Sequence, residues 1–212
     1  MIKLIIADDH AIVRAGIRRL LESDSDIEVL GEAGTGREAV ALCEKCRPDV
    51  AVLDYDMPEM DGLDATREII SRYPGVRVLI LTMFDSEEYA VRLIQAGALG
   101  FIIKGTNPDE LLCAVKKVAE GKSYISPTLM EKVAFFRSQG DRENPISSLS
   151  DRELQVLVRL ARGKVVREIS DELSLSPSTV ETYRRRILEK LDLRNVSDLT
   201  RFAIRFNLID TY

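Results

Sequence analysis

Histidine and cysteine are scarce in this chain of 212 residues, which holds one histidine and three cysteines. Cys43 and Cys46 form a C-x-x-C pair, but no second pair completes a zinc site. We interpret both as small helix residues, with a zinc or redox role as the alternative. So few cysteines are typical of a reducing compartment. We interpret His10 as a residue at the start of a helix, with phosphotransfer as the alternative.

The sequence also lacks a long apolar run. No stretch is long enough to cross a bilayer, and Met1 leads directly into a predicted strand without a signal peptide. There is no long repeat and no low-complexity tract. These absences predict a cytoplasmic protein without a membrane partner.

Negative charge is concentrated in the first two thirds of the chain. Residues 1–146 carry 18 Lys/Arg and 25 Asp/Glu, a net charge of −7, whereas residues 147–212 carry 12 and 10, a net charge of +2. Because an acidic surface repels phosphates, the first part is a poor nucleic-acid binder. The mildly basic second part is the better candidate for that role.

Short apolar runs alternate with amphipathic segments through residues 1–122. The runs are aliphatic or β-branched and end at turn residues, which is typical of buried parallel strands. The predicted strands are residues 3–7, 27–31, 50–53, 76–81 and 101–103, and the predicted helices are residues 10–22, 36–46, 63–72, 86–96 and 108–120. This order predicts an α/β domain with a doubly wound parallel sheet, a (βα)5 flavodoxin-like fold.

A polar, turn-rich stretch separates this domain from the rest of the chain. We interpret residues 123–147 as a linker that contains a predicted helix over residues 127–137. Residues 148–212 are predicted to form a small all-α domain, with Ser150 and Glu153 as a capping box at its first helix. Its predicted helices are residues 150–162, 166–173, 176–191 and 196–206.

The second and third of these helices have the outline of a helix-turn-helix. On the third helix, apolar residues mark the side that faces the core, and Glu181, Thr182, Arg184 and Arg185 point elsewhere. Arginine can contact phosphates or a guanine edge, and threonine can contact bases. A small helical protein-interaction module is the alternative.

Five reactive side chains follow predicted strands of the first domain. They are Asp8, Asp9, Asp54, Thr82 and Lys104. Because ligands bind outside the carboxyl ends of the strands in an open α/β sheet, we expect these residues to meet at one edge. Unrelated surface acids at strand ends are the alternative interpretation, which the agreement of all five positions disfavours.

Converging carboxylates repel one another unless a cation joins them. Mg²⁺ accepts carboxylate, water and phosphate oxygens, and a carboxylate beside it can attack phosphorus to form an acyl phosphate. The sequence Asp54-x-Asp56 also resembles the nucleophile motif of haloacid-dehalogenase-type phosphatases. That motif requires Thr or Val where this chain has Pro58, so we disfavour the phosphatase.

Residues 1–122 resemble the receiver domain of two-component response regulators. The resemblance rests on Asp8-Asp9, Asp54-Tyr55-Asp56-Met57-Pro58, Asp61-Gly62, Thr82 and Lys104. It implies that Asp54 is the phosphoacceptor, assisted by Lys104 and Thr82. The implied ligands of Mg²⁺ are Asp8, Asp9, Asp54 and the backbone carbonyl of Asp56. Thr82 and Phe101 would then form a two-state switch that responds to phosphorylation.

Residues 148–212 resemble the LuxR-type DNA-binding domain. The resemblance rests on Leu149-Ser150-Asp151-Arg152-Glu153, Gly163, Arg167-Glu168-Ile169-Ser170, Ser178-Thr179-Val180 and Lys190-Leu191. It implies that the third helix of the domain enters the major groove of DNA. The DNA-contacting residues so predicted are Ser178, Thr179, Glu181, Thr182, Arg184, Arg185 and Lys190. Glu181 departs from the basic residue common at its position in the family.

Together the two resemblances imply a phosphorylation-controlled transcriptional regulator of the NarL/FixJ class. The implied partners are a sensor histidine kinase, double-stranded DNA, a second copy of the chain when active and, as a further candidate, RNA polymerase. Such a protein is not an enzyme beyond its own phosphorylation and dephosphorylation. A DNA binder independent of phosphorylation and a receiver that acts through protein contacts alone are the remaining alternatives.

Overall fold

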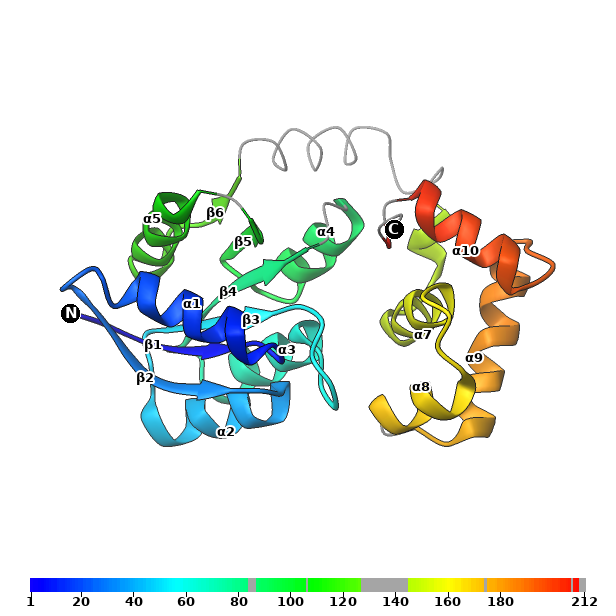
Figure 1. Ribbon diagram of the computed structural model, residues 1–212, viewed down its shortest axis with the longest axis horizontal. Helices are drawn as coiled ribbons and strands as arrows, with labels where there is room; N and C mark the ends of the chain where they lie inside the picture. Colours follow the sequence, from blue (N-terminus) through cyan, green and yellow to red (C-terminus); the bar gives the residue numbers. More distant parts are fainter. Residues whose placement is uncertain (84–86, 106, 127–144, 174, 207, 210–212) are drawn as a thin grey trace. The chain divides into compact units, whose positions relative to one another are not determined.

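The computed structural model describes residues 1–83, 87–105, 107–126, 145–173, 175–206 and 208–209. The chain divides into two compact units, one built around a sheet and one built from the last helices (Figure 1). The predicted helix over residues 127–137 lies outside the described residues. Across the described ranges, none of the helices is long and apolar enough to cross a membrane.

The first unit is a parallel six-stranded sheet with the strand order β2-β1-β3-β4-β5-β6. Its strands are β1 (Ile2–Ala7), β2 (Ile27–Ala33), β3 (Val50–Asp54), β4 (Arg77–Thr82), β5 (Gly100–Ile103) and β6 (Tyr124–Ile125). Its helices are α1 (Ala11–Leu21), α2 (Gly36–Cys46), α3 (Gly62–Arg72), α4 (Glu87–Gln95) and α5 (Pro108–Ala119). The predicted doubly wound α/β fold is confirmed.

The strands β1, β3, β4 and β5 are buried over most of their length, which explains their nearly continuous apolar sequences. One apolar cluster joins alternate residues of β1, β3, β4 and β5 to the inner faces of α1 and α5. Leu21 of α1 and Ala114 and Val118 of α5 are fully buried there. The polar residues Asp8, Asp54 and Thr82 lie at the carboxyl ends of these buried strands.

The structure contains a strand that the sequence did not predict. Tyr124 of β6 donates its backbone N–H to the carbonyl of Leu99 at 2.8 Å, and its hydroxyl donates to Glu110 Oε1 at 3.1 Å. Burial and the neighbouring Glu110 raise the pKa of Tyr124 to about 12. A strand of two residues carries no alternating pattern, so its sequence gave no signal.

The second unit is a small all-α domain, as predicted. It contains the 3₁₀ helix η1 (Pro145–Ser148), α7 (Asp151–Ala161), α8 (Val166–Glu172), α9 (Pro177–Lys190) and α10 (Val196–Arg205). The predicted capping box is present, because Ser150 Oγ accepts the N–H of Glu153 and Glu153 Oε2 accepts the N–H of Ser150. Ser176 caps α9 by accepting the N–H of Thr179 at 3.1 Å. The turn between α8 and α9 gives the outline of a helix-turn-helix.

Cys43 lies in the core of the sheet unit, on the inner face of α2, whereas Cys46 is half-buried. Burial, with a smaller contribution from Cys46, raises the pKa of the Cys43 thiol to about 12. Because the thiolate is the form that binds metals and reacts, Cys43 is held in its inert form. The geometry supports the interpretation of this C-x-x-C pair as helix residues.

We expect iodoacetamide at pH 8 to alkylate the exposed Cys113 well before Cys43 in the native protein. The raised pKa keeps Cys43 protonated through neutral and mildly alkaline pH. Peptide mass spectrometry measures each site, and protein unfolded in urea is the control in which all three cysteines should react. Early labelling of native Cys43 would contradict its burial.

Candidate functional site

The carboxyl end of the sheet brings together all five side chains that follow the predicted strands. Asp8 and Asp9 come directly after β1, and Asp54 and Thr82 end β3 and β4. Lys104 follows β5, and its backbone N–H donates to the carbonyl of Thr82 at 2.6 Å. Because β1, β3, β4 and β5 are consecutive neighbours in the sheet, their ends form one continuous edge.

A lysine joins the two buried carboxylates of this edge. Lys104 Nζ lies 2.7 Å from Asp8 Oδ2 and 2.8 Å from Asp54 Oδ2. Asp8 is 1% exposed and Asp54 is 5% exposed, and the side chain of Lys104 is also mostly buried. Two carboxylates so far from water need a positive charge beside them, which Lys104 supplies.

The electrostatics of Asp54 reflect burial opposed by Lys104. Burial raises the pKa of Asp54 to about 6, and the negative charges of Asp8 and Asp56 act in the same direction, while Lys104 lowers it. Burial alone would lower the pKa of Lys104, but Asp54 and Asp8 outweigh burial and raise it. Asp54 is therefore ionised at neutral pH and only weakly solvated, a state that favours reaction with an electrophile.

Asp9 and His10 form the outer part of the site. His10 Nδ1 lies 2.6 Å from Asp9 Oδ1, and the backbone N–H of His10 donates to Asp8 Oδ1 at 2.8 Å. The imidazole is 70% exposed and Asp9 is 33% exposed, so this contact lies at the solvent side of the site. Ligand atoms of Asp8, Asp9, His10 and Asp54 lie within 4.8 Å of one another, and the three carboxylates suit a hard divalent cation.

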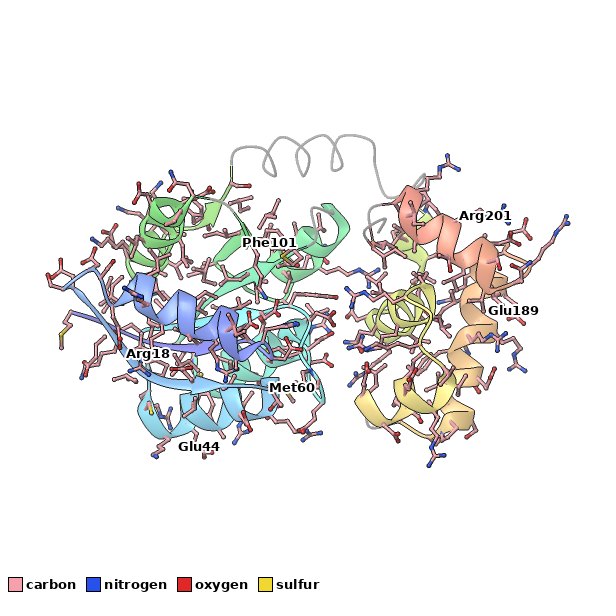
Figure 2. All side chains as sticks on the ribbon, viewed as in Figure 1. Arg18, Glu44, Met60, Phe101, Glu189 and Arg201 are labelled. Atoms are coloured by element: carbon pink, nitrogen blue, oxygen red, sulfur yellow. The ribbon has the colours of Figure 1, made fainter. Side chains whose placement is uncertain are left out.

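The loop after β3 is held close to the site by two glycines that sequence analysis did not single out for this role. Gly36, at the start of α2, donates its N–H to the carbonyl of Met60 at 3.2 Å. A Cβ on Gly36 would collide with that carbonyl, and a Cβ on Gly62 would collide with the carbonyl of Asp54. These close backbone approaches fix the loop that carries Asp56 (Met60 is labelled in Figure 2).

Thr82 and Phe101 lie inside the sheet unit. Both are almost fully buried, and Phe101 on β5 (labelled in Figure 2) pairs in register with Ile80 of β4 and with Ile125 of β6. Phe101 is thus turned inward, three residues before Lys104. Their role as a switch stays a prediction, since a single arrangement of the side chains is described.

The second candidate site lies on α9. Ser178 and Thr179 occupy its first turn, where each shares a hydrogen bond with the hydroxyl of Ser176, at 2.8 and 2.7 Å. Thr182 donates its hydroxyl to the carbonyl of Ser178. These residues lie on the side away from Val180 and Ile187, which are fully buried in the core of the unit.

The charged residues of α9 pair along the helix. Arg184 Nη1 lies 3.4 Å from Glu181 Oε1, and Arg185 Nε lies 3.8 Å from Glu189 Oε1. Arg185 is exposed and free to reach a phosphate, because an ion pair of this kind in water is weak. Lys190 differs from the others: its ammonium bonds to Glu153 Oε2 at 2.7 Å and to the carbonyl of Ser148 at 2.9 Å. Its predicted DNA contact is not tested by this geometry.

Family models match both halves of the chain. Residues 4–116 match the response regulator receiver domain, and residues 147–203 match the bacterial regulatory proteins of the luxR family. These are the two families that the sequence motifs resemble.

Curated relatives extend the similarity over nearly the whole chain. Response regulator GacA of Pseudomonas aeruginosa is 38% identical over 99% of both chains, and response regulator UvrY of Escherichia coli is 40% identical over 98% of this chain and 96% of its own. A solved structure of RcsB from Salmonella enterica serovar Typhimurium, bound to promoter P1flhDC in the presence of the phosphomimetic BeF3⁻, has a TM-score of 0.74 and 25% identity, with 96% of this chain and 98% of that chain covered. The chain therefore belongs to the two-component response regulators of the NarL/FixJ class, in which a receiver domain precedes a LuxR-type DNA-binding domain.

Proposed function

We propose that the protein is a transcriptional regulator controlled by phosphorylation of Asp54. The observation that carries this proposal is the position of the Asp54 carboxylate, which is buried and bonded to Lys104 at 2.8 Å beside Asp8. In the proposed domain boundaries, residues 1–122 form the receiver, residues 123–147 the linker and residues 148–212 the DNA-binding domain. The phosphoryl donor is a sensor histidine kinase, which the receiver family implies as its partner.

In the proposed reaction, an oxygen of Asp54 attacks the phosphorus of a phosphohistidine. The bond from phosphorus to the histidine nitrogen breaks, and the acyl phosphate forms on Asp54. Lys104 keeps Asp54 ionised before attack, since its charge opposes the effect of burial on the pKa. After attack, its ammonium is within reach of a phosphoryl oxygen and neutralises part of the added charge.

Mg²⁺ is the proposed cofactor of this reaction. Asp8, Asp9 and Asp54, with the backbone carbonyl of Asp56, would hold it, and their clustered oxygen atoms support this ligand set. When bound, Mg²⁺ supplies positive charge that offsets the repulsion between the carboxylates and the incoming phosphoryl group.

The proposed output is DNA binding by a dimer. Thr82 at the end of β4 and Phe101, buried in β5 three residues before Lys104, would change packing when the phosphoryl group arrives and shift a two-state equilibrium. On α9, Ser178, Thr179, Glu181, Thr182, Arg184 and Arg185 would face DNA. The promoter-bound structure of RcsB, with a TM-score of 0.74, supports DNA binding by this protein. RNA polymerase is the proposed partner at the promoter.

We expect Asp54→Ala to abolish phosphorylation by acetyl phosphate and Mg²⁺ without unfolding the protein. The variant loses the nucleophile, whereas Asp8 still pairs with Lys104. Intact mass shows whether one phosphoryl group is added, and circular dichroism checks the fold. Asp26→Ala, which removes an exposed carboxyl just before β2 at the opposite end of the sheet, is the control and should be phosphorylated normally.

In the same experiment, phosphorylated wild-type protein should bind its DNA more tightly than unmodified protein. A stable adduct on Asp54→Ala would refute the assignment of the phosphoacceptor. DNA binding of equal strength with and without the adduct would favour a regulator that does not depend on phosphorylation.

We expect Gly36→Ala to weaken Mg²⁺ binding roughly tenfold, about 1.4 kcal/mol. The added methyl group collides with the Met60 carbonyl and displaces the loop that carries Asp56. Isothermal titration calorimetry measures the affinity. Gly75→Ala is the matched control, because a Cβ there has nothing within 4 Å. Unchanged Mg²⁺ affinity in Gly36→Ala would show that the loop position does not matter for the metal.

We expect Arg185→Gln to weaken DNA binding across sequences and to reduce the salt slope of log K by about one unit, as loss of one phosphate contact does. Glu181→Lys should strengthen DNA binding and increase the salt slope, because it replaces a carboxylate that DNA phosphates repel with a cation that they attract. Fluorescence anisotropy at several salt concentrations measures both. Arg37→Gln, on α2 of the sheet unit, is the control. An equal change in its DNA affinity and salt slope would contradict the assignment of α9 as the DNA-binding helix.

A further inference from the structure

The last residue of α9 makes contacts unlike those of the other charged residues on that helix. Lys190 Nζ donates to Glu153 Oε2 at 2.7 Å and to the backbone carbonyl of Ser148 at 2.9 Å. Glu153 lies in the first turn of α7, and Ser148 ends η1. One ammonium group therefore joins three elements that are separate in the sequence (its neighbour Glu189 is labelled in Figure 2).

The carboxylate of Glu153 is held by the capping box of α7 as well as by Lys190. Glu153 is 3% exposed, and its Oε2 also accepts the backbone N–H of Ser150 at 2.7 Å in the capping box. Burial would raise the pKa of Glu153, but Lys190 and Ser150 outweigh burial and lower it. A buried carboxylate without a counter-charge is costly, so Glu153 requires Lys190.

The contact lies at the far end of α9 from its first predicted DNA contacts. Twelve residues separate Ser178 from Lys190, which is roughly 18 Å at 1.5 Å per residue. Between them, Val180 and Ile187 pack into the core, and apolar packing allows small rotations of a helix more readily than a directed ion pair does. Because a helix moves as a rigid rod, a small tilt at Lys190 displaces the hydroxyls of Ser178 and Thr179.

We propose that Lys190 is a positioning residue, which fixes the angle of the recognition helix α9 against α7 and η1 rather than contacting DNA. This inference rests on the proposed role of α9 in DNA binding. It also replaces the interpretation of Lys190 as a DNA contact that the sequence motif suggested. We call the set Lys190, Glu153 and the Ser148 carbonyl the α9 clamp.

The salt dependence of DNA binding separates a clamp from a phosphate contact. A lysine that binds phosphate contributes about one unit to the salt slope, whereas a lysine bonded inside the protein contributes none. The full-length protein is titrated against two duplexes of equal length by fluorescence anisotropy. One duplex is enriched from a random pool by the wild-type protein, and the other has a random sequence.

We expect Lys190→Gln and Glu153→Gln each to weaken binding to the enriched duplex about tenfold and to leave the salt slope unchanged. Binding to the random duplex, which depends on charge more than on alignment, should change less. The double variant should bind the enriched duplex with the same affinity as the weaker-binding single variant, because both substitutions break the same interaction. Lys190→Arg, which keeps the charge and the donors, should restore most of the affinity.

Lys164→Gln is the matched control. Lys164 Nζ bonds to Glu172 Oε1 at 2.6 Å and is as exposed as Lys190, but Glu172 is also held by Arg159. Loss of this pair removes the same charge from the same unit and leaves α9 attached. We expect its affinity for the enriched duplex to stay within about twofold of wild type, the range of ordinary surface substitutions.

Glu153→Gln decides the outcome even if Lys190→Gln does not fold. This substitution removes a negative charge and no DNA contact. If Lys190 contacted phosphate, Glu153→Gln would therefore bind DNA as tightly as wild type or more tightly. Unchanged or tighter DNA binding by Glu153→Gln would thus overturn the clamp. A salt slope reduced by about one unit in Lys190→Gln alone would overturn it as well. Failure of the wild-type protein to bind any duplex would instead refute DNA binding by α9, which is the proposed function.

Discussion

The receiver unit depends on one constraint, the burial of carboxylates at the edge of an apolar sheet. Asp8 and Asp54 are almost without solvent, and Lys104 lies within hydrogen-bond distance of both. The lysine lowers the cost of burial without removing it, since the pKa of Asp54 remains raised to about 6. The site is thus a region of the fold where burial of charge costs folding stability, as is common at functional sites.

In both units, close backbone contacts and helix caps fix the positions of the segments that carry the candidate functional residues. In the sheet unit, glycines at the starts of α2 and α3 let main-chain atoms approach closely, so that the loop between Asp54 and Gly62 follows one path. In the helical unit, caps at Ser150, Ser176 and Asn195 set where helices begin, and Lys190 at the end of α9 is bonded to Glu153 of α7. In the proposed function, both surfaces would thus be positioned by contacts within the protein.

Much of the fold and of the acidic site could be predicted from the sequence because the determinants are local. Apolar runs ending in Asp8, Asp54 and Thr82 define strands, and the rule for carboxyl ends of parallel strands brings them together. What could not be predicted depends on tertiary contacts. The strand β6 exists because Tyr124 finds the edge of β5, and the direction of Lys190 depends on Glu153, 37 positions away. Neither partner leaves a periodic signal in the sequence.

The pairing of β5 with β6 offers a way to follow changes in the packing of the receiver. Ile125 pairs with Phe101, the buried aromatic residue three positions before Lys104, while β6 itself has only two residues. So short a strand gains little free energy from pairing. A change of about 1.4 kcal/mol in the packing around Phe101 would alter the ratio of paired to unpaired β6 tenfold. In the proposed switch, a change in the packing of Phe101 would loosen β6 and expose the amide of Tyr124, which donates to the carbonyl of Leu99. Deuterium exchange at that amide would then report on the proposed switch without any label on the reactive residues.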